Sequence, residues 1–147
     1  MVKKEYVKQA INKEGFIILD VRSPAEYKGE DVRAKRGGHI PSAVNYEWIN
    51  VIDDENIPHF RRSNEIQKEL MELGITNEKI IIIYCQTPVR SAHMYFTLRL
   101  LGYHDIRVYE GSWAEWGNDS TTPIENPSLG RGISCLLEVI YLAGFTD

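Results

Sequence analysis

The run Ile80–Tyr84, which reads IIIIY, constrains the fold of this chain more than any other segment. β-Branched residues favour extended backbone, and a continuous apolar run of this length is typical of a strand covered on both faces. The run Phe16–Val21 has the same character. Because strands buried on both faces belong mainly to parallel sheets, the two runs predict an α/β domain.

Segments with helical features alternate with these strands. They are Lys3–Lys13, a capped start at Ser23–Glu26, Ser63–Leu73 and Arg90–Leu101. Two shorter strands are expected at Ala43–Tyr46 and Ile106–Tyr109. The alternation predicts a mostly parallel sheet with helices on both faces, in which ligands bind at the carboxyl ends of the strands.

Length and charge narrow the class of partner. A chain of 147 residues suffices for one domain with its own core. Its 17 basic and 21 acidic residues give a net charge of −4, which does not favour nucleic acid as a partner. The amino end lacks an apolar segment of signal-peptide length, and the apolar stretch Ile133–Ala143 is too short to span a membrane. We therefore expect a cytoplasmic protein without a membrane contact.

The composition changes near the carboxyl end. We expect residues 1–125 to form the domain, and residues 126–147 to form a linker and an apolar terminal helix of unknown role. Apolar side chains of this helix could cover part of the domain or form a homodimer contact. Cys135 lies among apolar residues of the same segment, so we expect it to serve in packing.

The loop after the isoleucine strand carries the clearest chemistry. It reads Cys85-Gln86-Thr87-Pro88-Val89-Arg90-Ser91, with a thiol at its start and a guanidinium group near its end. Loop amides and the positive end of the following helix stabilise an anion, so we expect a lowered pKa for Cys85 and a reactive thiolate. A cation at a helix start needs an anionic partner, and Asp20 is the candidate for Arg90.

Four sequence blocks together resemble a known family. They are Leu19–Arg22 (LDVR), Gly38–Asn45 (GHIPSAVN), Cys85–Ser91 (CQTPVRS) and Tyr109–Trp116 (YEGSWAEW). In order and spacing they are similar to the rhodanese family of sulfurtransferases, above all to the catalytic half of tandem thiosulfate sulfurtransferases. The resemblance covers Lys3 to Glu125 and implies a rhodanese-like α/β fold, with a central, mostly parallel five-stranded sheet and helices on both faces.

The resemblance also implies roles for individual residues. Cys85 is the implied persulfide carrier, Arg90 braces its loop, and Arg22 lies near the pocket to attract an anionic donor. The implied lining of the sulfur site comprises Gln86, Thr87, Pro88, Val89 and Ser91, with Trp113 at its border and the Asp20 carboxylate organising the arginines. Pro88 stands where many family members have glycine, and proline removes one amide donor from the loop.

The implied reaction needs no cofactor and no metal. Sulfane sulfur passes from thiosulfate, favoured here over mercaptopyruvate, to Cys85 and then to cyanide, a thiol or a protein acceptor. A non-catalytic rhodanese-like binding module is the alternative. A cysteine-dependent phosphatase is less favoured, because four residues separate Cys85 from Arg90 where the phosphatase loop has five.

Overall fold

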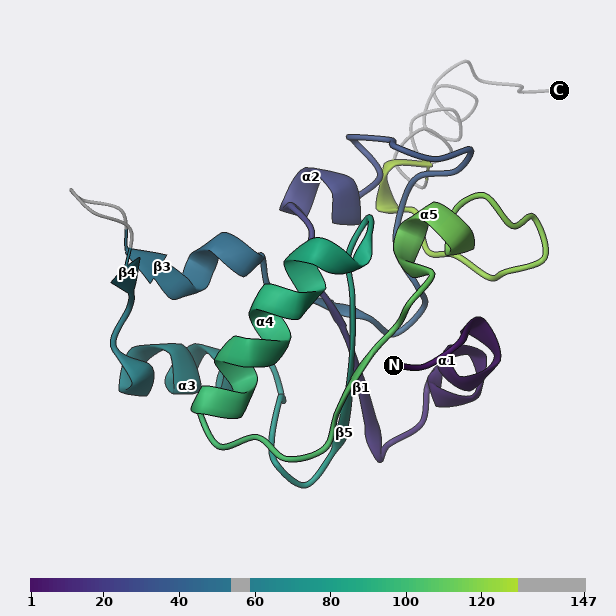
Figure 1. Cartoon of the computed structure of the whole chain (residues 1–147). Helices are drawn as coiled ribbons and strands as arrows, with labels where there is room; N and C mark the ends of the chain where they lie inside the picture. The colour runs from purple at the N-terminus through teal and green to yellow at the C-terminus, as the bar shows by residue number, and fades with distance from the viewer. Residues whose placement is uncertain (54–58, 130–147) are drawn as a thin grey trace, which may run out of the picture.

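The computed structural model describes residues 1–53 and 59–129 (Figure 1). In chain order the elements are α1 (Lys4–Ala10), β1 (Phe16–Asp20), α2 (Pro24–Tyr27), β2 (Val44–Asn45), the 3-10 helix η1 (Trp48–Val51), β3 (Ile52–Asp53), β4 (His59–Phe60), α3 (Ser63–Glu72), β5 (Ile80–Tyr84), α4 (Pro88–Leu100), β6 (Ile106–Val108) and α5 (Ser112–Trp116). The alternation of strands and helices confirms the α/β class.

The central sheet is parallel and has the strand order β2-β1-β5-β6. The two strongest strand predictions pair with each other at its centre, with Asp20 opposite Tyr84. The sheet has four strands where we expected five. At its β6 edge the chain start adds only an isolated parallel bridge between Val2 and Tyr109. β3 and β4 form a separate antiparallel pair.

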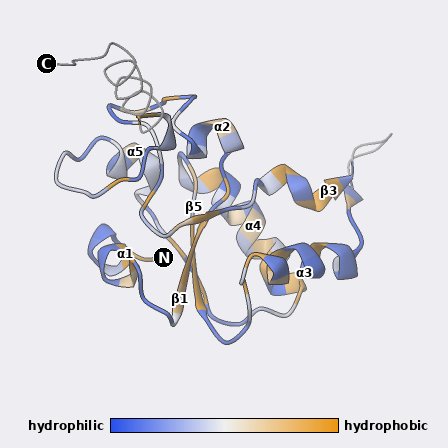
Figure 2. Ribbon diagram, turned by 180° about the vertical axis from the view of Figure 1, so that it is seen from behind, coloured by the Kyte–Doolittle hydropathy of each residue, from blue (hydrophilic) through white to orange (hydrophobic). Residues whose placement is uncertain are grey.

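Helices cover both faces of the sheet. α3 and α4 lie on one side of β1 and β5, and α1 and α5 lie on the other (Figure 1). The side chains of β5 alternate between the two cores: Ile81 and Ile83 pack toward α3 and α4, and Ile82 and Tyr84 toward α1 and α5. The central strands β1 and β5 are accordingly mainly hydrophobic, whereas the helices carry hydrophilic outer sides (Figure 2). Cys85 continues the alternation and belongs to the core under α3 and α4.

Element boundaries depart from the prediction at two helix ends. α4 begins at Pro88 and not at Arg90, because proline has the backbone angle of a helix and its missing N–H costs nothing in the first turn. α1 ends at Ala10, before the predicted end at Lys13. Asn12 adopts a φ of 56° there and donates its N–H to the Ser42 hydroxyl at 3.0 Å.

The predicted linker begins in contact with the domain. Asn126 donates a side-chain hydrogen bond to the carbonyl of Gly37 at 3.1 Å, and the Ser128 hydroxyl donates to the carbonyl of Lys28 at 2.7 Å. The rest of the predicted terminal segment, with Cys135, lies outside the described residues. None of the helices described here is long and apolar enough to cross a membrane.

Candidate active site

Cys85 follows β5 directly, at the carboxyl end of the sheet, and its side chain is buried. The start of α5 holds the main chain around it. The Cys85 N–H donates to the Ser112 hydroxyl at 3.4 Å, and the Cys85 carbonyl accepts from the Trp113 N–H at 2.8 Å. Ala114 donates in the same way to the carbonyl of Gln86 at 3.0 Å. α5 therefore fixes the first two residues of the loop, a role that the sequence did not indicate for Ser112.

Opposing influences act on the thiol of Cys85. Burial raises its pKa, whereas the positive charge of Arg90 and the backbone amides of Gln86 and Thr87 lower it. The net result is a raised pKa, so the predicted lowering is wrong for the resting site. The predicted donors are present, but a fully buried thiolate loses more in hydration than they return.

We expected Arg90 to pair with Asp20, but its partner in the structure is Glu26. The two guanidinium nitrogens Nη1 and Nη2 each lie 3.1 Å from a carboxylate oxygen of Glu26, which gives a bidentate ion pair. The Glu26 side chain is only 1% exposed, and that of Arg90 is 22% exposed. Arg90 also interacts with Cys85, so one guanidinium group contacts both the Glu26 carboxylate and the thiol.

Glu26 is a second site residue, besides Ser112, whose role the sequence did not indicate. Its position three residues after Ser23 indicates a helix cap, and the structure contains that capping box: Ser23 N–H donates to Oε2 at 3.0 Å, and Glu26 N–H donates to the Ser23 hydroxyl at 3.2 Å. Burial alone raises the pKa of Glu26, but hydrogen bonds from Arg90 and Ser23 outweigh it and bring the pKa to about 2. The carboxylate is therefore charged at neutral pH.

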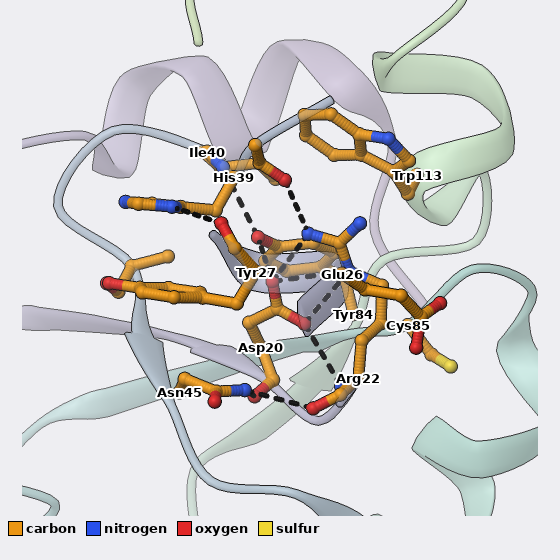
Figure 3. A network of polar contacts seen from close by, with 12 residues as sticks. Asp20, Arg22, Glu26, Tyr27, His39, Ile40, Asn45, Tyr84, Cys85 and Trp113 are labelled. Carbon is orange, nitrogen blue, oxygen red and sulfur yellow. Dashed lines mark hydrogen bonds and ion pairs between the residues drawn. The ribbon is translucent and has the colours of Figure 1, made fainter. Parts of the chain in front are cut away.

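Asp20, Arg22 and Tyr84 form a second polar cluster (Figure 3). Arg22 Nε lies 3.0 Å from Asp20 Oδ1, its Nη2 lies 2.6 Å from Asp20 Oδ2, and Nη2 also donates to the carbonyl of Gly38 at 2.7 Å. The Tyr84 hydroxyl donates to Asp20 Oδ2 at 2.7 Å. We expected Arg22 to attract an anionic donor. Its side chain is only 1% exposed, so its charge is not accessible to a donor from solvent.

The register of the sheet explains this placement. Asp20 lies opposite Tyr84 and shares its face, whereas Cys85, one residue on, turns to the other face. Trp113 completes the cluster, with its ring 4.5 Å from the Arg22 guanidinium and its indole N–H donated to the carbonyl of Arg36 at 3.2 Å. Its indole is buried in the core, and its main-chain N–H donates to the carbonyl of Cys85.

The remaining loop residues differ in exposure. Thr87 and Val89 are exposed, and Pro88 occupies the first position of α4. Gln86 donates its side-chain amide to the carbonyl of Arg33 at 3.0 Å. Ser91 is fully buried, and its hydroxyl has no hydrogen-bond partner within the described part of the chain. In that same part, no group of three or more His, Cys, Asp or Glu side chains is arranged to hold a metal ion.

Comparison with known proteins gives a consistent family assignment. A profile of the rhodanese-like domain matches residues 3–119. The thiosulfate sulfurtransferase of Azotobacter vinelandii is 43% identical over 122 residues, which are 83% of this chain and 44% of that protein. The sulfur carrier protein TtuD of Thermus thermophilus is 40% identical over 116 residues, 73% of this chain and 40% of that protein. The chain thus spans less than half the length of these relatives.

A solved structure is similar over most of the chain. The anaerobic ergothioneine biosynthesis enzyme of Chlorobium limicola, in complex with trimethyl histidine, superposes with a TM-score of 0.77 at 29% identity. The match covers 85% of this chain and 31% of that one. A structure of EanB with the same TM-score and 30% identity holds ergothioneine covalently linked with a persulfide cysteine.

Proposed function

This chain belongs to the rhodanese family, and from that premise we propose that it is a sulfurtransferase that carries sulfane sulfur on Cys85. One observation carries the proposal: the thiol lies at the carboxyl end of a central strand, where the amides of Gln86 and Thr87 and the guanidinium group of Arg90 are close enough to lower its pKa. These donors suit a sulfur anion, either a thiolate or a persulfide.

In the first step the Cys85 thiolate attacks the outer sulfur of thiosulfate. A sulfur–sulfur bond forms to Cys85, the sulfur–sulfur bond within thiosulfate breaks, and its electron pair leaves with sulfite. The product is a Cys85 persulfide that carries one negative charge, so the three negative charges of the reactants are conserved. The naming of several relatives as thiosulfate sulfurtransferases supports this donor.

In the second step a thiophilic acceptor such as cyanide attacks the terminal sulfur of the persulfide. A carbon–sulfur bond forms, the sulfur–sulfur bond breaks, and its electron pair restores the Cys85 thiolate. Thiocyanate is the product with cyanide, and a thiol acceptor takes the sulfur as its own persulfide. In both steps sulfur is transferred as a neutral atom between the donor, Cys85 and the acceptor, and no electrons pass to or from a further carrier, so neither step requires a redox cofactor.

Because the pKa of Cys85 is raised, we assign to Arg90 the role of increasing the thiolate fraction. With a mainly protonated thiol at neutral pH, the rate of the first step depends on the small thiolate fraction. Arg90 increases that fraction by its charge, and Glu26 holds the guanidinium group in place through two hydrogen bonds. A persulfide is a stronger acid than a thiol, so the same donors hold it as the anion once it has formed.

The burial of Cys85 favours a second candidate, a rhodanese-like binding module that does not turn over. Intact mass separates the two. We expect the purified protein to gain one sulfur atom on incubation with thiosulfate and to lose it, as thiocyanate, on addition of cyanide.

The control variants are Cys85→Ala and Cys135→Ala, which each remove one of the two thiols. Sulfur uptake should disappear in Cys85→Ala and persist in Cys135→Ala. Absence of uptake by the unaltered protein, with Cys85 inert to thiol reagents, would replace the sulfurtransferase with the binding module.

A further inference from the structure

An anionic donor that approaches Cys85 needs a cation that is accessible from solvent. Three arginines near the site have guanidinium groups committed within the fold. Arg22 is bonded to Asp20 and to the carbonyl of Gly38, Arg36 donates to the carbonyls of Trp116 and Thr122, and Arg90 is held by both oxygens of Glu26. Each of these groups stabilises the domain or the loop before a donor arrives.

Arg33 differs from them. Its side chain is 53% exposed, and its guanidinium group is bonded to the partly exposed Asp31 at 2.9 and 3.1 Å. Exposed pairs of this kind exchange readily with other anions, because water and salt screen them. Arg33 is therefore a cation that a donor can engage without breaking the core.

The position of Arg33 links it to the sulfur site at two points. Its carbonyl accepts the side-chain amide of Gln86, the residue next to Cys85, at 3.0 Å. Its Nη1 lies 3.8 Å from Oε1 of Glu26, the same oxygen that binds Nη2 of Arg90 at 3.1 Å. The two guanidinium groups thus flank one buried carboxylate, with Arg90 on the side of the thiol and Arg33 on the side of solvent.

We propose that Arg33 is the residue that receives the anionic sulfur donor at the mouth of the Cys85 site. The inference rests on the proposed sulfurtransferase function and adds a binding residue for the donor's sulfonate oxygens. Arg33 takes no part in breaking or forming a bond. Its contribution is to raise the local concentration of a doubly charged donor beside the loop.

Two thiol reagents of opposite character test this role separately from catalysis. Methyl methanethiosulfonate is neutral, and its 2-sulfonatoethyl analogue carries a sulfonate like that of thiosulfate. Both react with the Cys85 thiolate in the same way: a mixed disulfide forms and methanesulfinate leaves with the electron pair of the broken bond. The ratio of the two rate constants therefore reports the recruitment of the anion alone. In a Cys135→Ala background only Cys85 reacts.

We expect Arg33→Gln to lower the ratio of anionic to neutral rate constants about 3- to 10-fold, and the KM for thiosulfate to rise by a similar factor at unchanged kcat. Arg33→Lys should retain most of the ratio. Lys79→Gln removes the same charge at the amino end of β5, far from Cys85, and should leave the ratio unchanged. Added salt should lower the ratio in the parent protein and less so in Arg33→Gln.

An unchanged ratio in Arg33→Gln would overturn the inference. Failure of the proposed function has a different signature. If thiosulfate adds no sulfur to the parent protein while the ratio still depends on Arg33, the anion site stands and the sulfurtransferase does not. If sulfur is added and the ratio is insensitive to Arg33, only the inference fails.

Discussion

Among the described residues, Asp20 pairs with Arg22 and Glu26 pairs with Arg90; both carboxylates are buried, and the pairs differ in what surrounds the arginine. Asp20 and Glu26 are equally buried, at 0% and 1% exposed. Arg22 is enclosed as well, under the ring of Trp113 and bonded to a main-chain carbonyl. Arg90 is 22% exposed and interacts with the thiol of Cys85.

The difference shows how one pair of residue types serves two purposes. The guanidinium group of Arg22, held by a carboxylate and a carbonyl and covered by an aromatic ring, braces separate segments of the chain and is closed to a ligand from solvent. The guanidinium group of Arg90 is bonded to Glu26 on one side, and its other side remains available to interact with the sulfur of Cys85. The two faces of the sheet separate these purposes, since Tyr84 and Cys85 are neighbours that point in opposite directions.

Breaking the enclosed pair should have the largest effect. We expect Asp20→Ala to lower the free energy of unfolding by about 3–5 kcal/mol, because Arg22 would stay buried without a counter-charge. Urea denaturation monitored by tryptophan fluorescence measures the change. The double variant Asp20→Ala with Arg22→Met should recover most of it, since no charge is then buried. A loss below about 1 kcal/mol in Asp20→Ala would mean that the pair is solvated and is no brace.

Low pH should destabilise the protein through the second pair, Glu26 with Arg90. The pKa of Glu26 is about 2 in the folded protein against an ordinary value of 4.5. A lowered folded pKa contributes stability that is complete above the unfolded pKa and is lost as the pH falls from about 5 toward 2, by about 3 kcal/mol in total. We expect Glu26→Gln to flatten this part of the stability profile measured with urea. Glu78→Gln, which removes an exposed carboxylate, should leave the profile as it is.

The influence of Arg90 on the thiol is open to measurement. Since Arg90 is the largest influence that lowers the pKa of Cys85, we expect Arg90→Gln to raise that pKa further and to slow alkylation by neutral iodoacetamide about tenfold at mildly alkaline pH. The pH profile of the rate should move to higher pH.

The double variant Arg90→Gln with Glu26→Gln removes the carboxylate that the single change leaves unpaired. It should regain stability while keeping the altered profile. An unaltered profile in both variants would show that the amides of Gln86 and Thr87 alone support the thiolate.

The smallest expected effect concerns Ser91, the residue after Arg90. Its side chain is buried, and its hydroxyl has no hydrogen-bond partner among the described residues. Removing an unpaired buried hydroxyl removes its desolvation penalty, so Ser91→Ala should leave the free energy of unfolding unchanged or raise it by about 1 kcal/mol. A clear loss of persulfide in Ser91→Ala, with stability retained, would instead assign the hydroxyl to the sulfur site.

Several features of this fold can be predicted from short segments of the sequence. The isoleucine run predicts β5 with the bounds that the structure has, and Gly74 and Gly102 adopt the positive φ angles, 79° and 89°, expected of residues that end helices. The position of Cys85 at a strand end follows from the same reasoning. Each of these features depends on the conformational preferences of a few consecutive residues and does not require contacts with distant parts of the chain.

The partners of the charged groups could not be predicted in this way. Arg90 meets Glu26 across 64 positions, and Ser112 meets Cys85 across 27, because strands that are adjacent in the sheet bring their following loops together. The choice between Asp20 and Glu26 as the partner of Arg90 depends on which face each carboxylate occupies. The pKa of Cys85 depends on burial by several elements at once. Local preference places the thiol, and the three-dimensional packing decides which charges reach it.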